Sequence, residues 1–268
     1  MTKYIDNRSI FVDLGFDTDP LKPILSVSLD VSQTQCADKH AHPRAQLIYS
    51  SKGTMKVVAQ KSIWYVSPRQ AIWVPGMYEH QVFFLNDNHI RNVFVSAERA
   101  KVLPQQFFAL NIPPFMRELI LKVVRMGNNY DMDGVEGRLI NVLIDELGTI
   151  TPTKCFLPLS DDFHLRLAIN ELLKNPGDTR GIEHFAGIAC TSSRTLSRLF
   201  VKELGLSFSN WRKQLRLLTA VEMLDKGVPV SQISFELGYN SPSAFIEMFR
   251  KEYGIPPGKY SSDLEPYT

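Results

Sequence analysis

The sequence of 268 residues is first defined by what it lacks. It has only three cysteines, Cys36, Cys155 and Cys190, and their odd number and wide spacing exclude a disulfide framework and favour a reducing compartment. No apolar run reaches the roughly 20 residues that cross a bilayer, and the first residues lack the basic-then-apolar pattern of a signal peptide. The sequence therefore predicts a cytoplasmic protein without a membrane segment.

A large net charge is also missing. The formal charge is +2, so charge alone does not indicate a nucleic-acid partner. Basic residues instead gather between positions 194 and 216, where Glu203 is the single acid. They are Arg194, Arg198, Lys202, Arg212, Lys213 and Arg216. Such a patch indicates either phosphate contact or a solvated helix face.

The most organised stretch lies near the C-terminus. Residues 231–237 and 242–253 predict two short helices around a turn at Gly238, because Ser241 suits an N-cap and Pro242 the first helical position. Gly254 suits the end of the second helix, since glycine tolerates the left-handed backbone of a C-cap. A short helix, a turn and a second helix with a polar outer face is the helix-turn-helix pattern.

The same pattern occurs once more upstream, at a constant offset of 49 residues. Leu196, Phe200, Gly205 and Trp211 correspond to Phe245, Phe249, Gly254 and Tyr260. A long helix over about residues 207–224 separates the two copies. An internal repeat of this kind predicts two structurally equivalent units.

The run from LSRLF to ELGYNSPSAFIEMFRKEYG, with Gly205, Arg216 and Ala220, resembles the DNA-binding domain of the AraC/XylS transcription regulators. It departs after Tyr260, where that family often has Arg and this chain has Ser261. The resemblance implies double-stranded DNA and RNA polymerase as partners. It assigns DNA contact to Ser193, Arg194, Ser197 and Arg198 in the first copy and to Pro242, Ser243, Ile246, Glu247 and Arg250 in the second.

The N-terminal half has a different pattern of apolar and polar residues. Over about residues 24–97, short segments of alternating apolar and polar residues are separated by Gly, Pro, Asn, Asp and Ser, which predicts an all-β barrel or sandwich. Residues 1–22 show no clear period and predict an irregular segment, with at most a strand near 10–14. The predicted fold class is thus α+β with two domains: a β-barrel plus two helices, then an all-α domain with two helix-turn-helix motifs.

Three histidines stand out in the β region. On a continuing strand His40, His42 and Gln46 would share one face, and His80 follows in a second segment. The spacing resembles the two cupin motifs, but Gln46 replaces the usual Glu and Phe84 the usual Asn. The resemblance implies a cupin-like domain that binds a small effector, with candidate pocket residues His40, His42, Gln46, Trp64, Trp73 and His80.

His40, His42 and His80 are also candidate ligands for one divalent metal ion. The alternative is that they only form hydrogen bonds inside a polar pocket. Similarly, Trp64 and Trp73 line the effector pocket or belong to the plain core.

Residues 115–126 and 134–149 have apolar residues at helical spacing. These two helices either pack on the barrel or supply the surface of a homodimer. Residues 151–161 hold two prolines and no period, which favours a linker. We therefore expect an effector-binding and dimerisation domain over 1–150, a linker over 151–161 and a DNA-binding domain over 162–268.

The leading interpretation is a cytoplasmic transcription regulator, not an enzyme, controlled by a small effector in the N-terminal domain. One alternative is a metal-dependent cupin enzyme with an appended DNA-binding domain, which the loss of the carboxylate at Gln46 disfavours. The other is an architectural DNA-binding protein that responds to no effector.

Overall fold

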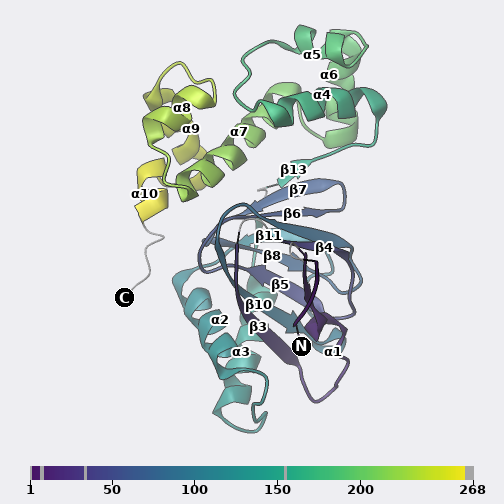
Figure 1. Ribbon diagram of the computed structural model, residues 1–268, viewed down its shortest axis with the longest axis vertical. Coiled ribbons are helices and arrows are strands. Elements are labelled where there is room, and N and C mark those ends of the chain that lie inside the picture. The colour runs from purple at the N-terminus through teal and green to yellow at the C-terminus, as the bar shows by residue number, and fades with distance from the viewer. Residues whose placement is uncertain (1, 7–8, 33–34, 154–155, 263–268) are drawn as a thin grey trace. The chain divides into compact units, whose positions relative to one another are not determined.

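The computed structural model describes residues 2–6, 9–32, 35–153 and 156–262 (Figure 1). The chain divides into two compact units. The first comprises residues 1–60 and 64–154, and the second comprises residues 61–63 and 155–268. Among the described residues, no helix combines the length and the apolar character needed to cross a lipid bilayer.

The first unit is rich in short strands (Figure 1). They are β1 (Thr2–Asp6), β2 (Ser9–Val12), β3 (Ile24–Val31), β4 (Cys36–His40), β5 (Ala45–Tyr49), β6 (Met55–Ala59), β7 (Ser62–Val66), β8 (Gln70–Val74), β9 (His80–Phe84), β10 (Asn88–Val95), β11 (Phe108–Asn111) and β12 (Pro152–Thr153). One sheet contains the run β1-β2-β4-β9-β6-β7, and the other has the order β12-β11-β8-β5-β10-β3. The β-rich fold is confirmed, but a closed barrel is wrong, because the strands form two separate sheets with edges of their own.

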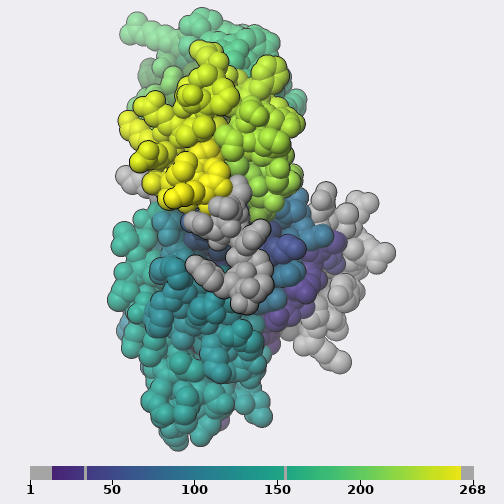
Figure 2. Space-filling model, turned by 90° about the vertical axis from the view of Figure 1, so that its left-hand side faces the viewer, coloured from purple at the N-terminus to yellow at the C-terminus, as the bar shows by residue number. Residues whose placement is uncertain are grey.

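Two helices cover one side of this unit: α2 (Pro114–Met126) and α3 (Val135–Thr149). Their buried residues, such as Ile120 and Ile140, join a core with strand residues Leu47 and Val93. In Figure 2 the two helices, in teal, form the near surface of the unit. They therefore pack on the sheet through their apolar faces. A single-turn helix, α1 (Ala97–Ala100), follows β10.

The second unit is helical. Its elements are β13 (Phe156–Pro158), α4 (Phe163–Lys174), α5 (Ile182–Ile188), α6 (Ser193–Leu204), α7 (Phe208–Asp225), α8 (Val230–Glu236), α9 (Pro242–Tyr253) and α10 (Pro257–Ser262). The predicted helix-turn-helix motifs are α5–α6 and α8–α9, and both are confirmed. The long helix between them is α7, with 18 residues.

In the regions expected to be irregular, the structure corrects one expectation in part, and the linker stays a prediction. Residues 1–22 contain β1, β2 and the 3-10 helix η1 (Asp13–Phe16). Strand β2 overlaps the expected strand near 10–14, β1 and η1 were not expected, and residues 17–22 form no helix or strand. The stretch 151–161 contains the short strands β12 and β13. Strand pairing depends on partners far along the chain, which the periodicity of a short segment does not reveal. Cys155 lies outside the described residues.

Candidate functional site

The two helix-turn-helix motifs have the same dimensions. Helices α5 and α8 each have seven residues, and α6 and α9 each have twelve. The side chain of Ser192 accepts a hydrogen bond from the backbone of Thr195, and Ser241 does the same with Ala244, each at 3.2 Å. The caps at the other end are Gly205 and Gly254, with φ of 68° and 77°. Serine and left-handed glycine thus fix both helices at equal length.

The buried faces of the two motifs also correspond. Phe200 and Phe249 are fully buried, and so are Leu196 and Phe245 one turn earlier. Phe200 packs on Trp211 with ring centroids 5.9 Å apart, and Phe249 packs on the matching Tyr260 at 5.3 Å. The offset read from the sequence therefore reflects two equivalent cores.

The outer faces differ. In α6 the side chains of Arg194, Ser197 and Arg198 are exposed, and Ser193 is half-buried. Arg194 and Arg198 are one turn apart on the same face. In the part of the chain that the structure describes, neither of these guanidinium groups has an ion-pair or hydrogen-bond partner. They are therefore available to an external anion or base edge.

Helix α9 presents Pro242, Ser243 and Glu247 in its first half, all exposed, and Arg250 further along. Ile246 is half-buried and packs against the apolar core of its own motif. The first half of α9 therefore offers a hydroxyl and a carboxylate, but no cation.

Arg216, on α7, contacts both motifs. Arg216 donates through Nε to the carbonyl of Pro176 at 3.2 Å and through Nη2 to the carbonyl of Asp178 at 2.9 Å. Its guanidinium also lies 5.5 Å from the ring centroid of Tyr239, which follows α8. Because Pro176 and Asp178 belong to the loop before α5, this single side chain contacts both motifs.

Two glycines make this junction tight. A Cβ on Gly177 would lie 1.9 Å from the carbonyl oxygen of Glu236, and a Cβ on Gly238 would lie 2.3 Å from that of Gly177. The loop before α5 and the turn after α8 thus touch backbone to backbone. Any larger side chain at either glycine would push the motifs apart.

The basic patch predicted from the sequence is therefore only partly free for phosphate. Arg212 donates to the carbonyls of Arg180 and Asp178, and Lys213 pairs with Glu252 at 2.9 Å. Sequence reasoning missed these internal roles, because the partners lie more than 30 residues away: loop carbonyls for Arg212 and the Glu252 carboxylate for Lys213. Arg194 and Arg198 remain as the external part of the patch.

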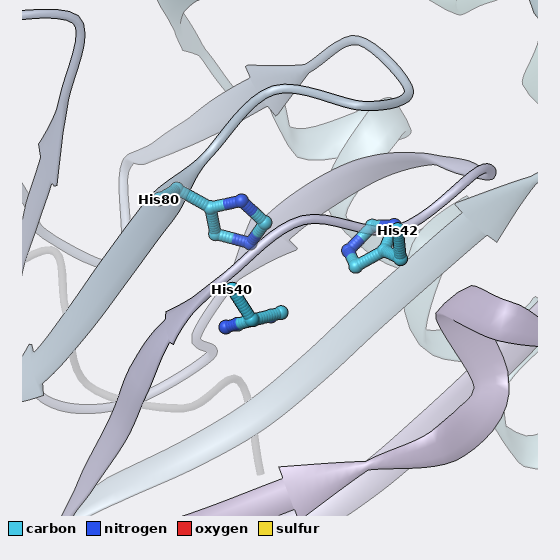
Figure 3. Close-up of side chains that lie close together, drawn as sticks. All are labelled: His40, His42 and His80. Atoms are coloured by element: carbon cyan, nitrogen blue, oxygen red, sulfur yellow. The ribbon is translucent and has the colours of Figure 1, made fainter.

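In the first unit His40, His42 and His80 converge (Figure 3). One ligand atom from each lies within 4.8 Å of the others. His42 and His80 are 2% and 1% exposed, and His40 is half-buried. Gln46, at the start of β5, places Oε1 3.0 Å from Nε2 of His42 and 3.1 Å from Nε2 of His80.

The convergence does not arise in the expected way. Strand β4 ends at His40, so His42 lies in the connection to β5 rather than two positions along one strand. His40 pairs with His80 across β4 and β9. Residues 41–44 lead from β4 in one sheet to β5 in the other, and the four side chains meet near this crossing.

Burial controls the charge of this cluster. It lowers the pKa of His80 to about 3, and the nearby His40 adds to that shift. Burial also lowers the pKa of His42. Both imidazoles are therefore neutral near pH 7, so each keeps one nitrogen lone pair.

A segment that sequence reasoning missed holds His42 in place. A Cβ on Gly15 would lie 2.5 Å from Cγ of His42, so only glycine lets η1 pack on this ring. Arg44, 1% exposed, donates to the carbonyls of Asp17 and Lys22 at 2.6 and 2.7 Å. A buried arginine that binds carbonyls gives no sequence signal.

A small cavity of ≈ 40 Å³ adjoins the histidines. Its polar lining includes His40, Gln46 and His80, and most of its other walls are apolar. The two tryptophans do not line it. Trp73 belongs to the core and donates to the carbonyl of Pro104 at 2.7 Å, and Trp64 packs on Phe107.

Comparison with known proteins decides the family. A family model described as a helix-turn-helix domain matches residues 185–263. The HTH-type transcriptional regulator NimR of Escherichia coli K12 is 35% identical over 225 residues, which cover 84% of this chain and 82% of NimR. The chain belongs to the AraC/XylS family of transcription regulators. It is thus a DNA-binding regulator, and the predicted family and the predicted role in transcription regulation are confirmed.

Another relative matches a smaller share of the chain. RipA of Corynebacterium diphtheriae is 30% identical over 126 residues, 43% of this chain and 38% of RipA. Among solved structures, ToxT from Vibrio cholerae covers 91% of this chain and all of its own at 12% identity and a TM-score of 0.39. That likeness is weak, and membership in the family rests on the sequence relatives.

Proposed function

We propose that this cytoplasmic regulator inserts α6 and α9 into successive major grooves on one face of the DNA. The observation that carries the proposal is the pair of equal motifs fixed to one helix. The 18 residues of α7 span about 27 Å, and successive major grooves are about 34 Å apart. The shortfall favours a bend in the DNA when both helices bind.

The two helices divide the work unequally. Arginine makes paired hydrogen bonds to guanine O6 and N7, so Arg194 and Arg198 of α6 suit base recognition. Ser193 and Ser197 accompany them on the same helix. On α9, Ser243, Ile246 and Glu247 reach base edges weakly, and Arg250 lies late in the helix, where phosphate contact is favoured. Pro242 positions the start of α9. We therefore assign most base discrimination to the first motif.

The first unit supplies the effector site in this proposal. His40, His80 and Gln46 form the polar end of a pocket whose other walls, apart from Asn92, are apolar, and His42 lies behind them rather than in the pocket lining. At ≈ 40 Å³ the cavity holds only a few water molecules, so in this proposal its apolar walls move apart for a small ligand whose one polar group binds the histidines. The enzyme alternative lacks support, because the relatives are regulators and Gln46 replaces the carboxylate that would serve as an acid or base.

We also propose a homodimer through α2 and α3. Phe115 and Val135 are 59% and 63% exposed on these helices although their opposite faces are buried on the sheet. Phe115→Glu should then convert a dimer to a monomer in analytical ultracentrifugation. An unchanged dimer would move the interface elsewhere. RNA polymerase stays a partner expected from the family.

Selection from a pool of random DNA tests the proposed function. The full chain should enrich a site that it binds about 10³-fold or more tightly than scrambled DNA. Footprinting of that site should show two protected major grooves one turn apart. No enrichment, or protection of a single groove, would contradict the use of both motifs.

A further inference from the structure

We propose that His40, His42 and His80 bind one divalent transition-metal ion, with Gln46 or water in the fourth position. This names the ligand class at the proposed effector site, so its regulatory meaning rests on the proposed function. The binding itself does not depend on that function. Three arguments carry it: the spacing of the donors, the proton positions on the rings, and the composition of the donor set.

The spacing fits with small side-chain rotations. Tetrahedral ligands about 2.0–2.1 Å from an ion lie about 3.3 Å from one another. The three candidate ligand atoms already lie within 4.8 Å of one another. The rings of His40 and His80 have centroids 4.4 Å apart, and those of His42 and His80 are 5.3 Å apart. The rings surround a common space rather than stacking (Figure 3).

The proton positions leave three lone pairs for an ion. Nδ1 of each ring lies against a backbone carbonyl: His40 on Asp38 at 2.6 Å, His42 on Arg44 at 2.7 Å and His80 on Tyr78 at 2.9 Å. A carbonyl only accepts, so each Nδ1 carries the proton and donates. With Nδ1 as the donor, the nitrogen left to bind an ion on each ring is Nε2. Histidines that ligate metals are held in this manner.

Gln46 alone does not account for the cluster. Its Oε1 faces Nε2 of His42 and Nε2 of His80. All three atoms are acceptors when Nδ1 carries the proton, so these contacts are repulsive without an ion or a donor between them. Turning the amide would let its two N–H groups donate to both rings, and that is the metal-free alternative. Both N–H groups of Gln46 are then engaged by His42 and His80, and Gln46 has no further donor for His40. An ion satisfies all three rings and the Gln46 oxygen together.

The donor set selects the kind of metal. Three imidazoles suit zinc, copper, nickel or cobalt, whereas magnesium and calcium prefer oxygen ligands. The adjoining cavity of ≈ 40 Å³ has room for a few water molecules. Where water rather than Gln46 takes the fourth position, this cavity would hold it.

Metal titration of the purified full chain, stripped with a chelator, tests the proposal. We expect about one zinc or cobalt ion per chain by elemental analysis, an upward shift in Tm, and the visible absorption of tetrahedral cobalt. Magnesium should give none of these. His42→Ala with His80→Ala should weaken binding at least about 100-fold, since each lost ligand costs at least about tenfold.

Two further variants test the same site if the His42→Ala, His80→Ala double variant folds poorly. His40→Gln changes a half-buried residue and should weaken zinc binding at least about tenfold. Gln46→Glu supplies an anionic ligand and should strengthen it by a similar factor. His89→Ala, on β10 outside the cluster, is the matched control and should leave binding unchanged. A wild-type chain that binds no zinc, or binding unaffected by His40→Gln and Gln46→Glu, would overturn the proposal.

DNA binding, measured in parallel, separates this inference from the proposed function. A chain that selects a DNA site but binds no zinc refutes the metal site alone. A chain that binds zinc through these histidines but selects no DNA refutes the proposed DNA reading and leaves the metal site standing.

Discussion

The two helix-turn-helix motifs have nearly the same interior but different exteriors. Both recognition helices have twelve residues, a serine cap and a left-handed glycine at the end, and both bury a Phe at the matching position. Yet α6 exposes Arg194 and Arg198, whereas the first half of α9 exposes no cation. Similar buried residues therefore give the two motifs the same architecture. In the proposed function, the different exposed residues determine which parts of the DNA each motif contacts.

Core substitution is the largest expected effect and tests the similarity of the interiors. Phe200→Ala and Phe249→Ala each remove a fully buried ring. Each should lower the free energy of unfolding by about 3–5 kcal/mol, through lost burial and the cavity left behind. Urea unfolding of the full chain measures both. A loss below about 1 kcal/mol for one Phe only would show that the two cores are not equivalent.

Arg216→Ala tests whether the motifs act as one body. It removes two charged hydrogen bonds to the carbonyls of Pro176 and Asp178. The unfolding free energy should fall by about 2–3 kcal/mol. The exposed Arg250→Ala is the control and should stay within about 0.5 kcal/mol of the wild type.

Affinity for the selected DNA site should show the same coupling. If Arg216 keeps the motifs at a fixed spacing, Arg216→Ala will weaken binding to a site with both half-sites more than to a single half-site. Equal weakening on the two DNAs would mean that the junction stabilises the fold but does not fix the distance between the two motifs.

Arg198→Ala addresses the difference between the exteriors. It should cost about 1–3 kcal/mol at the selected site and relax the preference at one base pair. Arg250→Ala should instead weaken selected and scrambled DNA alike and reduce the salt slope by about 1. Binding titrations at several salt concentrations measure both. Equal loss on both DNAs for Arg198→Ala would assign that side chain to phosphate.

The smallest effect concerns acid stability of the junction. A hydrogen bond from Arg180 lowers the pKa of Asp178 from its usual 3.8 to about 2. The carboxylate therefore stabilises the fold above about pH 4, and that contribution is lost as the pH falls toward 2. Because the Arg180 side chain is 53% exposed, the contribution is about 1 kcal/mol.

Asp178→Asn tests this contribution. The variant should be about 1 kcal/mol less stable than the wild type at pH 7, and the difference should disappear near pH 2. Unfolding curves across that range measure it. A difference that stays constant with pH would attribute the loss to packing rather than to the ion pair.

Sequence periodicity predicted the helices well. Residues 242–253 were expected to be helical and form α9, and the expected helix at 115–126 corresponds to α2. Helical hydrogen bonds, caps and apolar stripes are local, so a short window of sequence contains them. The same reason explains why the repeat was visible without a structure.

The histidine cluster was predictable only in part. The pattern around His40 and His80 placed these side chains together, as the structure does, but His42 reaches the cluster from a loop and not from a strand. Arg44 binds the carbonyls of Asp17 and Lys22, more than 20 residues earlier. Trp73 lies in a core built from residues distant in sequence. No local pattern encodes such contacts.

Measuring the binding penalty of every single base change across the selected DNA site tests the central claim most directly. The account predicts two blocks of contacts one helical turn apart, with penalties of about 1–3 kcal/mol concentrated in the block that α6 contacts. The block under α9 should show small penalties. Equal penalties in both blocks, or larger ones under α9, would contradict the unequal division between two motifs of equal architecture.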